Sequence, residues 1–255
     1  MSNAILVVQG LCKTFGGLNA VKDIDFQINK GEVFGLIGSN GAGKTSCFNL
    51  ITGFYKPTAG QISFLDKNIT GYKPYRVARQ GLIRSFQKTN VLKSLSVFEN
   101  VLSGHYMYAR QPLFRTFFPG PNVKRTERDM RDSAATIVDL LGLSERMDTP
   151  AYRLSCGELR LLEVAVALAA KPKLLMLDEP AAGLNSQEAM RLGNLIKRIC
   201  RNHVQSVALV EHNMSLVMDV CGHLMVMDLG RKIAEGRPEV VRNDPHVINA
   251  YLGGG

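Results

Sequence analysis

Short runs of β-prone hydrophobic residues, separated by turn-forming residues, dominate the first third of the chain. They occupy residues 5–8 (ILVV), 24–28 (IDFQI) and 33–37 (VFGLI), with Gly, Asn and Lys between them. Runs of this length and composition are typical of strands. We therefore expect a strand-rich N-terminal region, followed by a helix at 43–53 and another strand at 61–65.

In the middle of the chain the apolar residues recur with the spacing of a helix. Helical runs cover residues 98–108 and 126–141, and a buried helix is expected within 152–170. In the second run, apolar residues three or four positions apart share one face. They are Met130, Ala134, Ile137, Val138 and Leu141. This part of the chain is predicted to be a helical insert.

From Lys173 onward, strands and helices alternate. Strand-like runs at 174–178, 206–210 and 223–228 are separated by helical runs at 187–200 and 214–221, and a short helical tail follows. Strands alternating with helices of this length predict a parallel sheet with crossover connections.

Composition adds few constraints. The chain has 255 residues, of which 45% are hydrophobic and 21% charged, so one large domain, or a domain with an inserted subdomain, is expected. The longest apolar stretch, residues 164–170, is far shorter than the roughly 20 residues that span a bilayer, and the N-terminus lacks an export-signal pattern.

Five cysteines without a CxxC pair are typical of reduced cytosolic thiols. The net charge of +9 fits nucleic acid, anionic lipid or phosphate-bearing ligands without choosing among them.

The clearest chemical motif is GSNGAGKT at residues 38–45, which fits G-x-x-x-x-G-K-[ST] between an expected strand and an expected helix. Glycines let successive backbone N–H groups point at phosphate oxygens, the lysine adds charge at the β- and γ-phosphates, and the threonine hydroxyl can bind Mg²⁺. The alternatives are a glycine-rich turn without a ligand and a Rossmann loop, but G-x-G-x-x-G is absent here. The nucleotide ligands expected from this loop are Gly38, Ser39, Asn40, Gly41, Ala42, Gly43, Lys44, Thr45 and Ser46.

Two acidic residues end the apolar run LLMLDEP (174–180). Asp178 would lie at the carboxyl end of a strand, where open α/β sheets bind ligands, and would hold Mg²⁺. Glu179 would orient or deprotonate the water that attacks the γ-phosphate. Adjacent acids at a strand end can also be solvated turn residues, and only the phosphate loop favours the functional reading.

A helix is expected to begin at Ser155, three residues before Glu158. This spacing fits the S-x-x-E capping box, in which the two side chains satisfy backbone donors at a helix start.

Taken in order, these motifs resemble the ATP-binding subunits of ABC transporters, and the likeness covers essentially the whole chain. It is closest to the high-affinity branched-chain amino acid importers. The segments that carry this resemblance are FGGLNAV (15–21), GFYKPTAGQI (53–62), RSFQ (84–87), LSCGE (154–158), LDEPAAGLN (177–185), EHNMSLVMDV (211–220) and VINAYLG (247–253).

The resemblance implies an α/β fold of the P-loop NTPase type. A RecA-like core would carry an N-terminal antiparallel β-subdomain and an inserted α-helical subdomain. The chain would be one ABC ATPase domain, with core and β-subdomain at about 1–87 and 172–255 and the helical subdomain at about 88–171.

Further roles follow from the resemblance alone. Ser155 and Gly157 would grip the γ-phosphate of a nucleotide bound by a partner subunit, and Phe15 would stack on adenine. Gln87 would sense Mg²⁺ and the attacking water, and His212 would contact the γ-phosphate. The expected catalytic residues are therefore Glu179, His212, Gln87 and Lys44, and the expected Mg²⁺ ligands are Thr45, Gln87 and Asp178. Phe15 is equally compatible with a core position, and a lone histidine at a strand end is often structural.

Three positions depart from the family pattern. Glu158 stands where the signature usually has glutamine, and its charge would oppose a bound polyanion unless it caps its own helix. Cys156 replaces a glycine or tyrosine. Asn185 replaces an aspartate, although it can cap the next helix with Glu188. These departures put the hydrolysis rate in question. The basic insert at 110–131 fits either a solvated loop or a nucleic-acid or lipid-facing patch and stays unassigned.

The expected function is ATP binding and hydrolysis, with Mg²⁺, in an importer for branched-chain amino acids. The resemblance implies a second ATPase subunit, two permease subunits and an external substrate-binding protein, at the inner face of the cell membrane and without nucleic acid. Related urea, amide or lipopolysaccharide systems, and soluble ABC ATPases acting on nucleic acid or ribosomes, remain alternatives.

Overall fold

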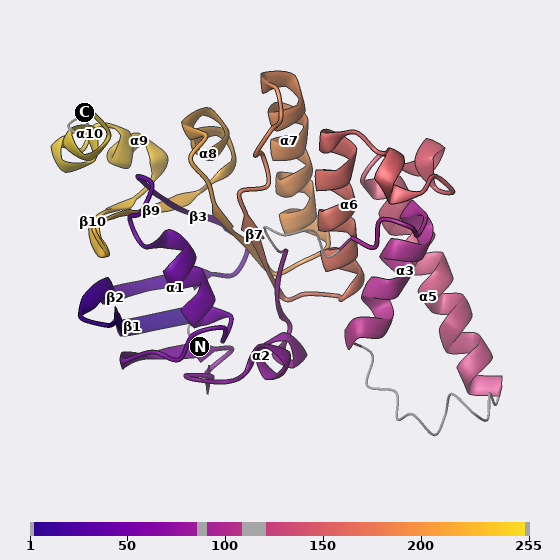
Figure 1. The fold of residues 1–255 in the computed structure, drawn as a ribbon, viewed down its shortest axis with the longest axis horizontal. Helices are drawn as coiled ribbons and strands as arrows, with labels where there is room; N and C mark the ends of the chain where they lie inside the picture. The colour runs from indigo at the N-terminus through magenta and orange to yellow at the C-terminus, as the bar shows by residue number, and fades with distance from the viewer. Residues whose placement is uncertain (1–2, 86–90, 109–120, 253–255) are drawn as a thin grey trace. The chain divides into compact units, whose positions relative to one another are not determined.

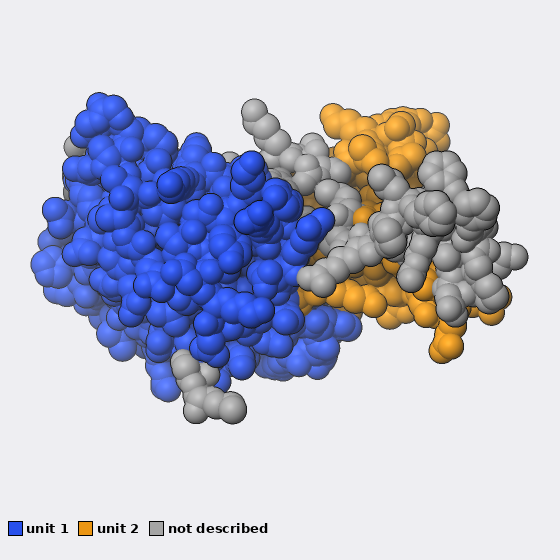
Figure 2. Space-filling model, turned by 90° about the horizontal axis from the view of Figure 1, so that it is seen from below, with its two compact units in different colours: residues 1–84, 173–255 blue, residues 85–172 orange. Residues whose placement is uncertain are grey.

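The computed structural model describes residues 3–85, 91–108 and 121–252. The chain divides into two compact units, which Figure 2 colours separately. Unit 1 comprises Met1–Arg84 and Lys173–Gly255, and unit 2 comprises Ser85–Pro172. Unit 2 is thus inserted in sequence between the two halves of unit 1.

A four-stranded antiparallel sheet forms one layer of unit 1. Its order is β2-β1-β4-β5, and Leu6 of β1 pairs with Ile28 of β2 and with Phe64 of β4. Along β2, Ile24, Phe26 and Ile28 are buried while the residues between them are exposed, as expected for a sheet with one covered face. The strands are β1 Ala4–Phe15, β2 Leu18–Asn29, β4 Ala59–Phe64 and β5 Lys67–Asn68.

The second layer is a six-stranded sheet of order β10-β9-β3-β8-β7-β6. Its strands are parallel except for β10, which pairs antiparallel with β9. Strands β3, β7 and β8 are buried at every residue, which explains their continuous rather than alternating hydrophobic pattern. The bounds are β3 Val33–Gly38, β6 Leu82–Arg84, β7 Leu174–Asp178, β8 Ser206–Val210, β9 His223–Asp228 and β10 Arg231–Gly236.

Helix α1, Lys44–Ile51, packs between the two sheets of unit 1. Its buried residues Cys47, Phe48 and Leu50 belong to the same hydrophobic cluster as residues of both sheets. Helices α7, Ser186–Asn202, and α8, Met214–Val220, lie together on the other side of the six-stranded sheet (Figure 1). The other helices described in unit 1 are α2 Pro74–Gln80, α9 Pro238–Arg242 and α10 Pro245–Leu252.

Unit 2 is helical in its described part. Its helices are α3 Val97–Tyr108, α5 Pro121–Leu140 and α6 Cys156–Ala169, and two single-turn 3₁₀ helices at Ser144–Arg146 and Ala151–Arg153 precede α6. Residues Ala134 and Val138, which the helical period had placed on one face, are fully buried. Within the described ranges, no helix is long and apolar enough to cross a membrane.

The strands predicted at 206–210 and 223–228 match β8 and β9 residue for residue. The elements that were not predicted include α2, β5 and β6. Helix α2 buries only Val77, so it lacks an apolar stripe, and β6 has only three residues. All five cysteines are free.

Candidate nucleotide-binding site

The glycine-rich loop leaves the carboxyl end of β3 and enters α1. Gly38 and Gly43 have φ values of 154° and 98°, in the region that side chains disfavour. A Cβ atom at Gly38 would lie 2.1 Å from the carbonyl oxygen of Met227, and one at Gly43 would lie 2.4 Å from that of Ala20. The two glycines therefore let the loop pack directly against β9 and β2, which fixes its curl.

Lys44 lies folded back onto this loop. Its Nζ donates hydrogen bonds to the carbonyl oxygens of Gly38 at 2.9 Å and Ser39 at 2.8 Å. Burial lowers the pKa of the Lys44 ammonium, and the nearby carboxylates of Glu179 and Asp178 oppose that change. Electrostatic interactions strengthen where water is excluded, so this partly desolvated ammonium is suited to bind an anion.

A pocket of about 540 Å³ opens beside the loop. Residues 40–46 line one side, Glu179 and Leu229 line another part, and Phe15 also contributes. Phe15 is 40% exposed, so it is not a core residue. Its ring meets the Tyr55 ring edge-on at 5.1 Å and lies 4.8 Å from the Lys13 ammonium.

Asp178 ends β7 and is buried. It pairs with the guanidinium of Arg84, which also donates from Nη1 to Asn49 Oδ1 at 2.6 Å. Arg84 therefore neutralises Asp178 and connects β7 to α1, the helix that begins with Lys44. Arg84 was not predicted as a site residue, although it begins RSFQ (84–87), one of the segments that carry the family resemblance.

A divalent cation fits this end of the sheet. Asp178 Oδ1 is buried and has no hydrogen-bond partner among the described residues, and carboxylate and hydroxyl oxygens are the ligands that Mg²⁺ prefers. Thr45 lines the adjoining pocket. No group of three His, Cys, Asp or Glu side chains in the described ranges could hold a metal alone, so further ligands would come from phosphate and water. Gln87, the third predicted ligand, lies outside the described residues.

Glu179 follows Asp178 in a left-handed conformation, with φ of 47°. Its backbone N–H donates to Val210 O at 2.9 Å, which fixes the turn against the end of β8. His212 Nδ1 lies 4.0 Å from Glu179 Oε1. Unit 1 thus brings four predicted site residues together, because Lys44 interacts electrostatically with both acids and His212 adjoins Glu179.

Glu211 joins the two loops that carry these groups. It is fully buried. One oxygen, Oε1, accepts the N–H of Ala181 at 2.8 Å, and Oε2 accepts those of His212 at 3.1 Å and Asn213 at 3.3 Å. The carboxylate therefore links the turn after β7 to the turn after β8. Glu211 was not predicted as a site residue. Its sequence signal is an acidic residue directly after the apolar run of β8.

In unit 2, Ser155 and Glu158 form the predicted capping box at the start of α6. Ser155 Oγ accepts the Glu158 N–H at 3.2 Å, and Glu158 Oε2 accepts the Ser155 N–H at 2.8 Å. The hydrogen bond from the Ser155 backbone is the main cause that lowers the pKa of Glu158, and Arg146 adds an ion pair at 2.9 Å. The carboxylate thus caps its own helix, while Ser155 and Cys156 stay exposed.

Asn185 is a second predicted cap that the structure confirms. Its side chain accepts the N–H groups of Gln187 and Glu188, both at 3.0 Å, at the start of α7. Glu188 completes this capping box by accepting the Asn185 N–H at 2.9 Å. Asparagine therefore serves as a helix cap in the position where the family pattern has aspartate.

Comparison with known proteins decides the family. The model of the ABC transporter family matches residues 21–182, and that of the branched-chain amino acid ATP-binding cassette transporter matches residues 231–255. The chain belongs to the ABC transporter ATP-binding family.

Curated relatives of this ABC protein align over nearly its whole length. The high-affinity branched-chain amino acid transport ATP-binding proteins LivG of Salmonella typhimurium and BraF of Pseudomonas aeruginosa are each 40% identical over 253 residues, covering 99% of both chains. A probable LivG of Methanocaldococcus jannaschii is 35% identical, covering 98% of this chain and 97% of its own length. The resemblance to branched-chain importers is thereby confirmed.

Solved structures agree on the fold. A nucleotide-free ATP-binding cassette from an ABC transporter is 34% identical with a TM-score of 0.85, covering 98% of this chain and 99% of its own. A cassette in its ADP conformation is 33% identical with a TM-score of 0.86, covering 99% and 100%. The predicted α/β P-loop fold is confirmed.

The position of Glu211 in this ABC protein leads to a first prediction. Glu211→Ala leaves the N–H groups of Ala181, His212 and Asn213 without their acceptor, so the loops carrying Glu179 and His212 are expected to lose their relative position. Misplacement of this kind costs about 100-fold in kcat, and Glu211→Gln, which keeps one acceptor oxygen, should lose less. Steady-state phosphate release, together with nucleotide affinity, measures the effect. An Ala variant with normal kcat, equal to an exposed control such as Glu239→Gln, would contradict it.

Proposed function

We propose that this chain is the ATP-binding and hydrolysing subunit of an ABC importer that energises the uptake of branched-chain amino acids. The observation that carries the proposal is the pocket in which the glycine-rich loop and Glu179 face a common space beside Phe15. The 40% identity to branched-chain amino acid transport ATP-binding proteins over 99% of both chains supports the transport assignment.

The loop is proposed to bind the phosphate chain of ATP. Its N–H groups, at the start of α1, form the positive end of a helix, and Lys44 contributes an ammonium already held within 2.9 Å of the loop carbonyls. Thr45 and Asp178 are proposed to hold Mg²⁺, which when bound adds positive charge at the phosphate oxygens. Phe15, exposed at the pocket, is proposed to stack on the adenine ring.

Glu179 is proposed to orient the attacking water and accept its proton. A carboxylate suits this role because it accepts a hydrogen bond from the water along the line of attack. His212, 4.0 Å away, is proposed to contact the γ-phosphate. Gln87 keeps the role that the resemblance implies and lies outside the described residues.

The start of α6 is proposed to complete the site of a second ATPase subunit. Its exposed residues Ser155 and Cys156, with Gly157, stand at the N-terminus of a 14-residue helix, where phosphate binding is favoured. Two subunits would then enclose two ATP molecules between them, and loss of the γ-phosphate would release this contact.

Chemical labelling of Cys156 tests this arrangement. Cys156 is the one exposed cysteine in the part of the chain described here, and burial raises the pKa of Cys47 and Cys221 to about 12. A maleimide is therefore expected to label Cys156 first. ATP should slow this labelling severalfold in the Glu179→Gln variant, because the partner subunit then covers the helix start. Equal labelling rates with and without ATP, in protein that binds ATP, would refute the shared site; Cys156→Ser gives the background.

The transport role includes two permease subunits, an external substrate-binding protein and a place at the inner face of the cell membrane. Uptake measurements test it. A strain lacking this chain should lose uptake of labelled leucine, and the wild-type chain, but not the Glu179→Gln variant, should restore it. Loss of urea uptake with unchanged leucine uptake would assign the motor to another substrate.

A further inference from the structure

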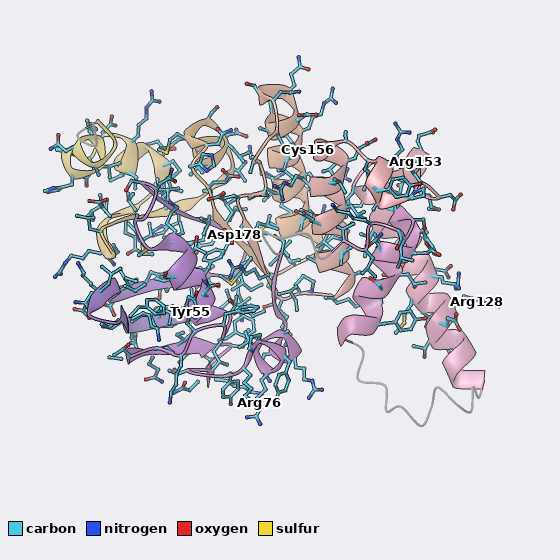
Figure 3. The ribbon with its side chains drawn as sticks, in the orientation of Figure 1. Tyr55, Arg76, Arg128, Arg153, Cys156 and Asp178 are labelled. Atoms are coloured by element: carbon cyan, nitrogen blue, oxygen red, sulfur yellow. The ribbon has the colours of Figure 1, made fainter. Side chains whose placement is uncertain are left out.

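Helix α2 and the loop after α1 form an exposed basic face on unit 1. Lys73, Arg76 and Arg79 are exposed, and Val77 is the only fully buried residue of α2. Figure 3 shows Arg76 projecting outward from this helix. From Lys67 to Arg84 the sequence contains no acidic residue. The face thus carries positive charge with no acid in its own segment.

The loop at 53–56 adds to the same face. A Cβ atom at Gly53 would lie 2.2 Å from the carbonyl oxygen of Tyr72, and one at Gly71 would lie 3.7 Å from Lys56 Cγ. The two segments are therefore neighbours in space, and Lys56 extends the charge. We call this surface the α2 face; it consists of Lys56, Tyr72, Lys73, Tyr75, Arg76 and Arg79.

None of the four cations of the α2 face belongs to an ion pair among the described residues. Their positions contrast with that of Arg84, which is buried and paired with Asp178. Unpaired cations on one surface create a positive potential that extends about a Debye length into solvent. The α2 face is therefore suited to an anionic surface.

Two exposed tyrosines lie among these cations. Tyr75 is 51% exposed and Tyr72 is 36% exposed, and the guanidinium carbon of Arg79 lies 5.6 Å from the centre of the Tyr75 ring. Tyrosine and long cationic side chains together are the residues that concentrate at the membrane–water interface, where a ring can rest among headgroups while its hydroxyl stays hydrated.

We propose that the α2 face contacts anionic lipid headgroups. A docking site for a protein would be expected to have an apolar centre that becomes fully buried. On the α2 face the exposed large side chains are tyrosines and cations, and the adjoining loop adds one exposed apolar side chain, Phe54, at 47%. A single exposed phenylalanine beside four cations is not an apolar centre, so the chemistry favours a peripheral, mainly electrostatic contact with lipid. This inference does not depend on ATP hydrolysis.

Vesicle sedimentation tests the proposal with the purified full chain. We expect the chain to bind vesicles of phosphatidylcholine with 30% phosphatidylglycerol and to bind pure phosphatidylcholine vesicles little. Each cation that contacts the anionic lipid should raise the affinity about fivefold. The triple variant Lys73→Gln, Arg76→Gln, Arg79→Gln should bind about 100-fold more weakly. Tyr72→Ser with Tyr75→Ser should lose a smaller factor.

A charge-matched variant separates a specific face from net charge. Arg191→Gln, Arg201→Gln and Arg242→Gln remove the same charge from exposed positions outside the α2 face and should leave binding nearly unchanged. Equal losses in the two triple variants would overturn the proposal in favour of nonspecific attraction. Unchanged vesicle binding in the α2 triple variant, with poorer recovery of membrane subunits in a pull-down, would overturn it in favour of a protein partner. ATP turnover, measured in parallel, should stay normal in all variants.

Discussion

Lys44→Ala is expected to lower ATP turnover by at least about 100-fold, the typical cost of removing one charged group that stabilises phosphoryl transfer. Nucleotide affinity should fall as well. The reason is that the loop itself holds the Lys44 ammonium, through the carbonyls of Gly38 and Ser39. Phosphate release and equilibrium nucleotide binding measure the two effects.

The matched control is Lys30→Ala, which removes an exposed lysine from the same unit. It should keep normal turnover. The Lys44→Ala protein should stay folded, because the substitution removes the Lys44 donor from only two loop carbonyls. A thermal unfolding curve checks this. Full affinity and full turnover in a folded Lys44→Ala protein would remove the basis for the nucleotide site.

Glu179→Gln is expected to stop hydrolysis while leaving ATP bound. Glutamine has the same shape as glutamate but cannot accept a proton at neutral pH, and loss of a general base typically costs about 10²–10⁴ in rate. The loop, Lys44 and Asp178 are unchanged, so affinity should be preserved. With hydrolysis blocked, ATP should also convert the protein to a dimer, which light scattering after gel filtration would detect.

Two results would count against this role of Glu179. One is phosphate release by Glu179→Gln at the rate of Glu239→Gln, an exposed control on α9. The other is loss of ATP affinity together with activity, which would make Glu179 a binding group. A monomer in the presence of bound ATP would leave the catalytic role intact and contradict the shared site instead.

The sequence predicted those parts of the fold that depend on local pattern. Strands β8 and β9 were predicted at their observed bounds because apolar runs end there at polar residues. Helix α5 was predicted from residue 126 but begins at Pro121, since its first turn has no apolar period. Helix α2 was missed because a seven-residue helix with one buried side chain carries no periodic signal.

The residues of the site also divide into those that local sequence predicts and those that depend on distant contacts. Lys44, Asp178 and Glu179 were found because motif spacing and strand ends are local properties. The partners that place them are distant in sequence: Arg84 lies 94 residues from Asp178, and Glu211 lies 30 residues from Ala181. Such pairings depend on strand order, here β8 between β3 and β7, which one sequence does not specify. The capping boxes of Ser155 and Asn185 were predictable because they span three residues.

The curl of the glycine-rich loop has a thermodynamic consequence. Its carbonyls already hold an ammonium, and its glycines already rest against the backbone of β9 and β2. The conformational entropy of this segment has therefore been lost during folding, before any nucleotide arrives. Because the fold itself fixes the loop's curl, nucleotide binding is expected to spend little free energy on ordering this segment, so the favourable contacts contribute almost fully to affinity.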